Sequence, residues 1–266
     1  MIRQATGQKD PVIALLKELG TEDGRRRAGR FFAEGEEIVR RAFDYGGHVD
    51  TLIVTERFSS DPKCAGLAGL ARSVGAEIVT ASEGLLAKVL EAKPTPECIA
   101  IVQRETAQMD AILSASRALV LMVEHGENAD NLGMLLRSTD AAGVDGVVLA
   151  AATTDPFARR VVRGSRGAVF TTPICIQYDP VRVIAAARKA GLQVVATSAR
   201  SDDAYTSVDY TRPTLVVVGN EHVGISDEVR KAADTVVYIP MRGRINSLNI
   251  AVAGSIVLYE ALRQRA

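Results

Sequence analysis

Apolar residues in this chain fall into short unbroken runs that alternate with stripes of helical spacing. The runs at 118–124, 192–197 and 214–218 contain few polar positions, as expected of parallel strands covered on both faces. Between such runs, apolar residues recur every three or four positions, which indicates amphipathic helices. This alternation of strands and helices, joined by short turns, predicts an α/β fold.

The first half of the chain is predicted to form an α/β module of its own. The expected helices cover residues 10–19, 38–43, 62–74 and 82–91, and the expected strands cover 49–55, 77–80 and 98–103. Ser82 is a good N-cap residue for the last of these helices. The arginine-rich stretch 24–29 is predicted to be a turn.

The second half is predicted to contain a parallel sheet. The expected strands cover 118–124, 146–151, 173–177, 192–197, 214–218 and 235–239, and the expected helices cover 132–142, 155–162, 180–190 and 226–233. A last helix is predicted to start at Asn246 or Ser247, both good N-cap types. The predicted domains are therefore residues 1–104, a polar linker at 105–116, and residues 117–266.

Ligands of open α/β sheets gather at the carboxyl ends of the strands. Four polar loops follow predicted strands there, at 124–131, 197–198, 219–221 and 240–249. Although far apart in the sequence, these loops are expected to converge on one edge of the sheet. The last loop, with two arginines and a glycine before a helix start, suits an anionic or carbonyl-rich ligand, or is only a well-capped helix start.

Composition narrows the class of protein. The 266 residues carry 32 basic and 32 acidic side chains, so a globally basic nucleic-acid-binding surface is not expected. The three cysteines are scattered, which predicts neither a disulfide framework nor a metal site and favours a reduced, cytoplasmic setting. No apolar run reaches the roughly 18 residues of a membrane span, so no membrane partner is expected.

Common catalytic fingerprints are missing from the sequence. There is no GxGxxG after the first strand of either half, no GxxxxGK[ST] and no GxSxG, and the three histidines are dispersed. Arginines, in contrast, cluster at 25–30, 159–166 and 242–244. Their planar forks grip phosphate well, although solvated arginines would give the same pattern.

Three polar motifs resemble those of a known family. Residues 128–137, 218–226 and 239–249 are similar, in order and separation, to the three motifs of the SpoU/TrmH family of RNA ribose 2′-O-methyltransferases, within the SPOUT superfamily. The first half resembles, more weakly, the ribosomal-protein-L30e-like substrate-binding domain that often precedes this catalytic domain. That weaker likeness lies in the arginine-rich stretch, residues 31–35 and the helix after them.

The resemblance implies an L30e-like α/β domain followed by a SPOUT α/β domain whose chain forms a deep trefoil knot, a rare exception to unknotted topology. It also implies a homodimer formed through the last helix, and S-adenosylmethionine as cofactor. Carried over by position, the cofactor contacts are Thr197, Ser198, Gly219, Asn220, Ile239, Met241, Ser247 and Leu248. The expected RNA contacts come from the arginine clusters and are Arg25, Arg26, Arg27, Arg30 and Arg166.

The family's catalytic positions are held here by Asn131, Arg137, Glu221, Ser247 and Asn249. A guanidinium, with a pKa above about 12, does not act as a base, so Arg137 is expected to hold a phosphate and stabilise the developing alkoxide. Structural alternatives exist for several of these residues. Asn131 and Ser247 are also good helix caps, and Glu221 could pair with a surface arginine.

Some positions depart from the family pattern. Ala129 stands where the first motif often has proline, Asn246 replaces a commonly acidic residue, and Ala251 replaces a common serine. None of these changes removes an expected catalytic group.

The favoured interpretation of the whole sequence is methylation of 23S ribosomal RNA, either as housekeeping or as antibiotic resistance. The alternatives are a tRNA 2′-O-methyltransferase, a non-catalytic RNA-binding or ribosome-assembly factor, and a small-molecule methyltransferase.

Overall fold

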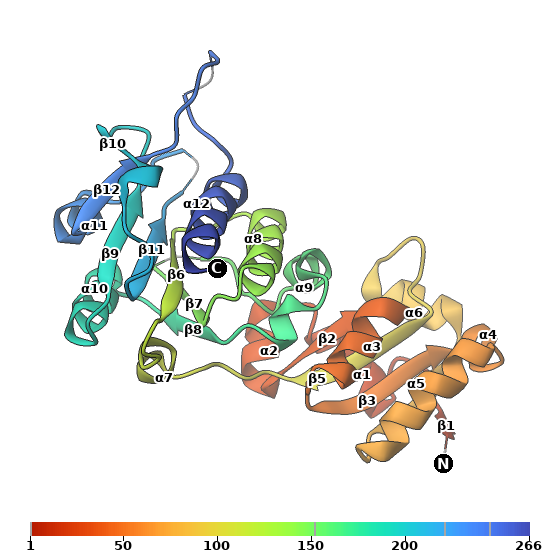
Figure 1. The fold of residues 1–266 in the computed structure, drawn as a ribbon. Coiled ribbons are helices and arrows are strands. Elements are labelled where there is room, and N and C mark those ends of the chain that lie inside the picture. Colours follow the sequence, from red (N-terminus) through yellow and green to blue (C-terminus); the bar gives the residue numbers. More distant parts are fainter. Residues whose placement is uncertain (1, 152, 221, 245) are drawn as a thin grey trace. The chain divides into compact units, whose positions relative to one another are not determined.

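The computed structural model describes residues 2–151, 153–220, 222–244 and 246–266. The chain forms two compact units. Unit 1 comprises Met1–Glu105 and Phe157–Thr171, and unit 2 comprises Thr106–Pro156 and Thr172–Ala266 (Figure 1). The backbone therefore passes between the units after Glu105, after Pro156 and after Thr171.

Among the described residues, unit 1 contains a five-stranded mixed sheet in the order β1-β4-β3-β5-β2. Its strands are β1 (Ile2–Gln4), β2 (Arg30–Glu34), β3 (Val49–Thr55), β4 (Glu77–Ala81) and β5 (Cys98–Gln103). β1, β4 and β3 run parallel, whereas β5 is antiparallel to both β3 and β2. The sheet confirms the three strands predicted for this half and adds β1 and β2.

The helices of unit 1 are α1 (Pro11–Glu18), α2 (Glu22–Ala28), α3 (Glu36–Asp44), α4 (Glu56–Ser59), α5 (Pro62–Ser73), α6 (Glu83–Leu90) and α9 (Arg159–Ser165). Most of them begin at a capping side chain, whereas α3 and α9 begin without one. Ser82 caps α6 as predicted, with its side chain accepting the Leu85 amide. Asp10 and Asp61 cap α1 and α5, each followed by proline at the first helical position. Apolar side chains of α1, α6 and the sheet form one core.

The predicted turn at 24–29 is wrong, because this stretch is helical. Thr21 caps α2 by accepting the Gly24 amide, and Gly29 closes the helix in the left-handed conformation at φ 61°. Between these caps stand three arginines, which are good helix formers. Gly24 itself lies against the backbone of Glu18, where an added Cβ would come within 2.0 Å of the carbonyl oxygen. The glycine therefore serves close packing here.

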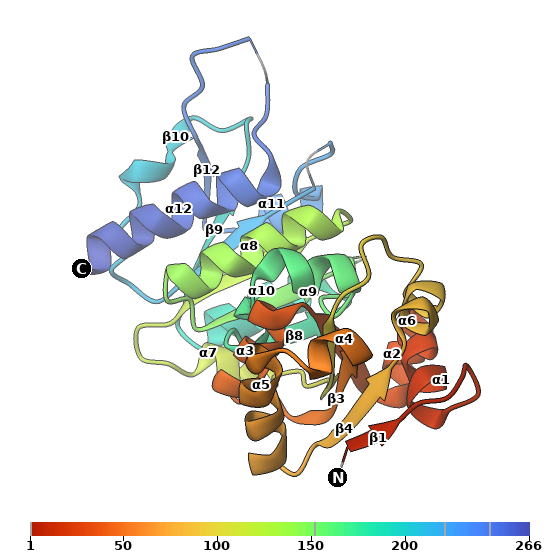
Figure 2. The ribbon, with the colours of Figure 1, turned by 90° about the vertical axis from the view of Figure 1, so that its right-hand side faces the viewer.

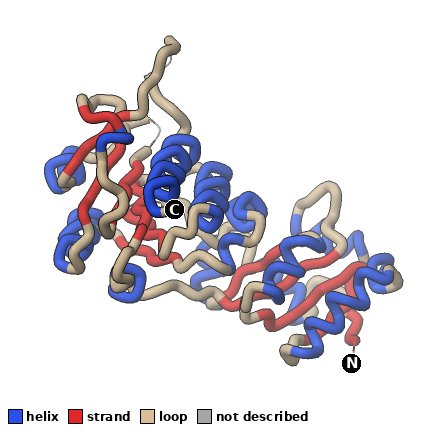
Figure 3. Tube along the Cα trace, in the orientation of Figure 1, coloured by secondary structure: helices blue, strands red, loops and turns tan. Residues whose placement is uncertain are grey.

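Among the described residues, unit 2 contains a seven-stranded, all-parallel sheet in the order β10-β12-β9-β11-β6-β7-β8. Figure 3 shows its strands in red, with helices in blue on either side. The strands are β6 (Leu119–Glu124), β7 (Gly146–Ala150), β8 (Ile174–Gln177), β9 (Gln193–Thr197), β10 (Asp203–Ala204), β11 (Thr214–Val218) and β12 (Thr235–Tyr238). The predicted parallel sheet is confirmed, and the short β10 is an addition to it.

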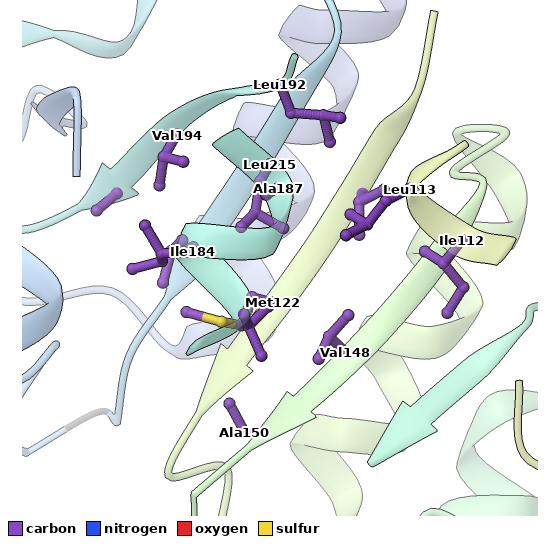
Figure 4. Packing of buried hydrophobic residues seen from close by; sticks show 14 of the residues in the cluster. Ile112, Leu113, Met122, Val148, Ala150, Ile184, Ala187, Leu192, Val194 and Leu215 are labelled. Atoms are coloured by element: carbon purple, nitrogen blue, oxygen red, sulfur yellow. The ribbon is translucent and has the colours of Figure 1, made fainter. Parts of the chain in front are cut away.

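Helices cover both faces of this sheet. They are α7 (Met109–Leu113), α8 (Ala129–Ala141), α10 (Pro180–Lys189), α11 (Asp227–Ala232) and α12 (Ile250–Arg265). Residues of α7, α10 and α11 pack on one face around Met122 and Leu215 (Figure 4). α8 and α12 lie side by side (Figures 1 and 2), so closely that a Cβ on Gly254 would come within 2.7 Å of Leu135.

Three helix starts predicted for the second half of the chain need correction. The last helix begins at Ile250, not at Asn246 or Ser247, because Asn249 provides the cap. α8 begins at Ala129 with Asn128 as its cap, three residues before the predicted start. α9 begins at Arg159 rather than at 155. The supposed linker at 105–116 contains α7, whose Ile112 and Leu113 are buried in the core of unit 2.

Candidate functional site

The carboxyl ends of β6, β9, β11 and β12 meet at one edge of the parallel sheet, as predicted. Hydrogen bonds tie these ends together. The Ser198 amide donates to the Val237 carbonyl at 2.9 Å, and the Thr197 hydroxyl donates to the Val217 carbonyl at 3.2 Å. The Asn220 side-chain amide donates to the His125 carbonyl at 3.1 Å. The loops that follow these strands are therefore held against one another.

The loop after β6 places Asn131 on the first turn of α8. Asn128 caps this helix by accepting the amides of Asp130 and Asn131, at 2.9 and 3.2 Å. Asn128, and not Asn131, therefore caps α8. Asn131 is 8 % exposed. It lines a small pocket with Gly126, Asn128, Leu135 and Ile250 among other residues.

Asn249 joins the third motif to the first. Its Nδ2 donates to Oδ1 of Asn131 at 2.8 Å, and its own Oδ1 accepts the Ala251 amide at 2.9 Å to cap α12. The two asparagines are separated by 118 positions in the sequence. The structure therefore brings together two of the five predicted catalytic residues, each anchored at the first turn of a helix.

The other predicted catalytic residues differ in their surroundings. Arg137 lies on α8, exposed, and makes no hydrogen bond or ion pair with another described residue. Ser247 is exposed in the loop before α12 and does not cap that helix. Glu221 lies outside the described residues. Arg137 thus lies on the same helix as Asn131, and no carboxylate among the described residues pairs with its charge.

Five of the eight predicted cofactor residues lie at or just after the ends of the neighbouring strands β9, β11 and β12: Thr197, Ser198, Gly219, Asn220 and Ile239. The other three, Met241, Ser247 and Leu248, lie in the loop between β12 and α12. Partly exposed positions in this set are Thr197, Ser198, Gly219, Ile239, Met241 and Leu248. At Gly219 an added Cβ would lie 2.4 Å from backbone atoms of Gly224 and Ile225, so only glycine fits. Asn220 is different, because its buried side chain is occupied within the protein, accepting the amide of His222 at 2.8 Å. Any ligand contact by Asn220 is left to its backbone.

Two residues of this edge were not predicted from the sequence. Glu124, the last residue of β6, is fully buried and accepts the Ser226 amide at 2.9 Å. Arg230, on α11, donates to the Ser198 hydroxyl at 2.6 Å. The sequence did contain a signal for Glu124, because a carboxylate ends an otherwise apolar strand. Nothing in the sequence pattern pointed to Arg230.

The predicted RNA-binding arginines of unit 1 are mostly engaged in contacts within that unit. Arg25 is buried, 5 % exposed, and donates to the Leu19 carbonyl at 3.0 Å, so its place on an RNA-binding surface is corrected. The others pair with carboxylates: Arg26 with Asp23 at 2.6 Å, Arg27 with Glu18 at 2.6 Å, Arg30 with Asp50 at 2.5 Å and Arg166 with Glu37 at 2.6 Å.

The second arginine cluster holds the 157–171 segment in unit 1. Arg159 pairs with Glu34 at 2.6 Å and donates to the Leu90 carbonyl at 2.9 Å. The Phe157 ring packs against Phe31 with centroids 4.9 Å apart. Arg159 therefore has a structural role, which the sequence pattern could not separate from phosphate binding.

Family models match both halves of the chain. Residues 118–259 match the SpoU rRNA methylase family, and residues 10–100 match the MRM3-like substrate-binding domain. The 23S rRNA (uridine(2479)-2′-O)-methyltransferase of Streptomyces viridochromogenes is 32 % identical over 93 % of this chain and 87 % of its own length. The 23S rRNA (guanosine(2553)-2′-O)-methyltransferase RlmP of Bacillus subtilis is 28 % identical over 97 % of this chain and 98 % of its own length.

Solved structures agree over nearly the whole chain. The AdoMet-bound rRNA methyltransferase of Sinorhizobium meliloti superposes with a TM-score of 0.89 at 28 % identity, covering 100 % of this chain and 99 % of that one. AviRb of Streptomyces viridochromogenes, in complex with AdoMet, gives 0.86 at 30 % identity, covering 97 % and 98 %. Sequence motifs, parallel sheet and full-length similarity lead to the same conclusion: the chain belongs to the SpoU rRNA methylase family.

Proposed function

We propose that this protein transfers a methyl group from S-adenosylmethionine to a ribose 2′-hydroxyl of 23S ribosomal RNA. The observation that carries this proposal is the Asn131–Asn249 hydrogen bond, which joins the first and third motifs beside the ends of the parallel strands. The full-length relatives from Streptomyces viridochromogenes and Bacillus subtilis, both 23S rRNA 2′-O-methyltransferases by name, support the same reaction and substrate.

The residues at the ends of β9, β11 and β12 fit this cofactor. The side chains of Thr197, Ser198, Ile239, Met241 and Leu248 are uncharged, and Gly219 allows close backbone approach. Such a set suits the edge of an adenine and a ribose better than it suits a phosphate. When bound, S-adenosylmethionine supplies an electrophilic methyl group on its sulfonium.

Within this site the residues divide the work of positioning and charge stabilisation. Arg137, exposed and without a carboxylate partner among the described residues, holds the phosphate next to the target ribose and stabilises the 2′-oxygen as its proton passes to solvent water. Asn131 and Asn249 orient the ribose from two fixed helix starts. Glu221 and Ser247 are assigned to the same site by their motif positions. Positioning two reactants is itself worth roughly 7–11 kcal/mol.

We propose further that the chain acts as a homodimer through α12. Val252 and Tyr259 on this helix are 47 % and 50 % exposed, and Met134 on the neighbouring α8 is 46 % exposed. An apolar surface of this kind is unusual for a helix facing only water.

The trefoil knot of the C-terminal domain and the L30e-like character of the N-terminal domain are part of the same proposal, as is cytoplasmic location.

The experiment that tests the function is transfer of labelled methyl from S-adenosylmethionine to protein-free 23S rRNA, assembled large subunits, or bulk tRNA. Label is expected in the ribosomal samples and not in tRNA. The related tRNA-modifying enzyme of A. aeolicus covers only 59 % of this chain, which disfavours the tRNA alternative. Label in tRNA alone would replace the proposed substrate. Cofactor binding without transfer to any RNA would favour a non-catalytic RNA-binding factor.

A further inference from the structure

Helix α11 connects two of the loops that surround the proposed cofactor pocket. Its cap residue, Ser226, is held at the end of β6, because its amide donates to Oε2 of Glu124 at 2.9 Å. Glu124 is fully buried, and its other oxygen, Oε1, has no hydrogen-bond partner among the described residues. Burying a carboxylate is unfavourable unless it accepts hydrogen bonds, so the Ser226 amide offsets part of the desolvation of Glu124.

One turn along the same helix, Arg230 reaches the loop after β9. Its Nη2 donates to the Ser198 hydroxyl at 2.6 Å, and its Nη1 donates to the Arg200 carbonyl at 3.3 Å. The Arg230 amide donates to the Ser226 carbonyl at 2.9 Å, which fixes the arginine to the anchored cap. The β9 loop is thus held by a side chain whose own helix is held by Glu124.

The contacts to Ser198 determine which hydrogen bonds remain to it. A serine hydroxyl can accept two hydrogen bonds and donate one. Ser198 Oγ already accepts two, from the Arg200 amide at 3.1 Å and from Arg230 Nη2 at 2.6 Å. Its own O–H has no acceptor among the described residues. Ser198 therefore faces a ligand as a hydrogen-bond donor.

We propose that Arg230 is a positioning residue that makes Ser198 a donor to an acceptor atom of the adenosine part of S-adenosylmethionine, a ring nitrogen or a ribose oxygen. This inference rests on the proposed function. Arg230 does not contact the reacting atoms. It acts through Ser198, and its effect is confined to cofactor binding.

The chain offers a matched control for this role. Arg188, on α10, pairs with Asp234 at 2.5 Å, and Asp234 accepts the amide of Val194 near the amino end of β9. Arg188 and Arg230 are therefore both arginines beside β9, one near each end of the strand. Only Arg230 touches a residue of the proposed cofactor pocket.

The test is titration calorimetry with S-adenosylmethionine on the full-length chain, together with transfer kinetics, for wild type, Arg230→Ala, Arg230→Lys, Ser198→Ala, the double variant and Arg188→Ala. Loss of one hydrogen bond predicts about tenfold weaker binding for Arg230→Ala, with KM for the cofactor rising equally and kcat unchanged. The double variant is expected to be no weaker than Ser198→Ala, because Arg230 acts through that hydroxyl. Arg230→Lys, which keeps a single cationic donor nitrogen, restores part of the affinity, and Arg188→Ala leaves the affinity unchanged.

Additive losses in the double variant, or an Arg230→Ala protein that binds the cofactor normally, would overturn the inference while leaving the function intact. If wild type itself neither binds S-adenosylmethionine nor transfers methyl, the proposed function fails instead. Thermal unfolding of each variant separates loss of fold from loss of affinity. An Arg230→Ala protein that melts as wild type does and binds tenfold more weakly supports the assignment.

Discussion

The arginines of unit 1 and Arg137 of unit 2 look alike in sequence but differ in their contacts. In unit 1, Arg25 is buried on a backbone carbonyl, and Arg27 and Arg166 pair with carboxylates. In unit 2, Arg137 is exposed and has no such partner among the described residues. Clustering in the sequence therefore says little about phosphate binding. A cation without a protein counter-charge leaves its charge available to a ligand, and the proposed role of Arg137 rests on this difference.

The largest effect is expected from substituting Arg137, which has no carboxylate partner among the described residues. Arg137→Ala is expected to lower kcat about 10²–10³-fold, the usual cost of losing one preorganised donor to a developing oxyanion. The Kd for S-adenosylmethionine should stay within about twofold, because Arg137 is assigned to the RNA and not to the cofactor. Single-turnover methyl transfer and cofactor titration measure the two quantities. Loss of cofactor binding would contradict the role given to Arg137.

The buried arginine should behave in the opposite way. Arg25→Ala leaves the Leu19 carbonyl without its donor, so it is expected to lower the free energy of unfolding by about 1–3 kcal/mol. The folded variant should bind RNA with the wild-type salt dependence. Urea unfolding checks the first expectation and filter binding the second. A variant of wild-type stability that binds RNA more weakly would place Arg25 back on the RNA-binding surface.

Unit 2 contains a buried carboxylate, Glu124, and two substitutions separate the contribution of its charge from that of its hydrogen bond. Glu124→Ala removes the acceptor of the Ser226 amide and is expected to cost about 1–3 kcal/mol of stability. Glu124→Gln keeps an oxygen that can accept the same amide, so it should cost less. Urea unfolding of both variants gives the comparison. Equal losses would mean that the charge of Glu124, and not its hydrogen bond, is what the site requires.

The smallest effect is expected from an exposed, paired arginine. Arg26 and Asp23 have side chains 63 % and 79 % exposed, so their ion pair contributes little to stability and can open toward a phosphate. Arg26→Glu is expected to weaken RNA binding and to reduce the slope of log affinity against log salt by at least about 0.7.

Arg72→Glu is the control for that experiment, since it makes the same charge change on α5 of the same unit. It should leave the slope unchanged. If both variants behave alike, the effect is one of net charge, and the assignment of Arg26 to RNA contact is wrong.

Except for the short β10, the strands of unit 2 and the convergence of its loops could be predicted from the sequence, because parallel strands buried on both faces read as unbroken apolar runs. Helix starts were less predictable. Asn128 and Asn131 are both good cap residues, as are Ser247 and Asn249, and only the positions of neighbouring backbone amides decide between them. Local sequence offers candidates for a cap but does not rank them.

Long-range contacts account for what the sequence could not reveal. Glu124 and Ser226 are 102 positions apart, and Ser198 and Arg230 are 32 apart, so no local pattern connects either pair. The same holds for Arg159, whose partner Glu34 is 125 positions away and draws the 157–171 segment into unit 1. The family resemblance supplied the motif residues, but not the residues that hold the motifs in place.

The most direct test of the central claim is the chemical position of the transferred methyl group. A 2′-O-methyl ribose cannot assist cleavage of its own 3′ phosphodiester, so alkaline hydrolysis of labelled 23S rRNA should release the label in alkali-stable dinucleotides. Wild type is expected to produce that species, and Arg137→Ala should produce at least about 10²-fold less of it. Label recovered instead as mononucleotides would mean that a base is methylated, which would contradict the account of this site.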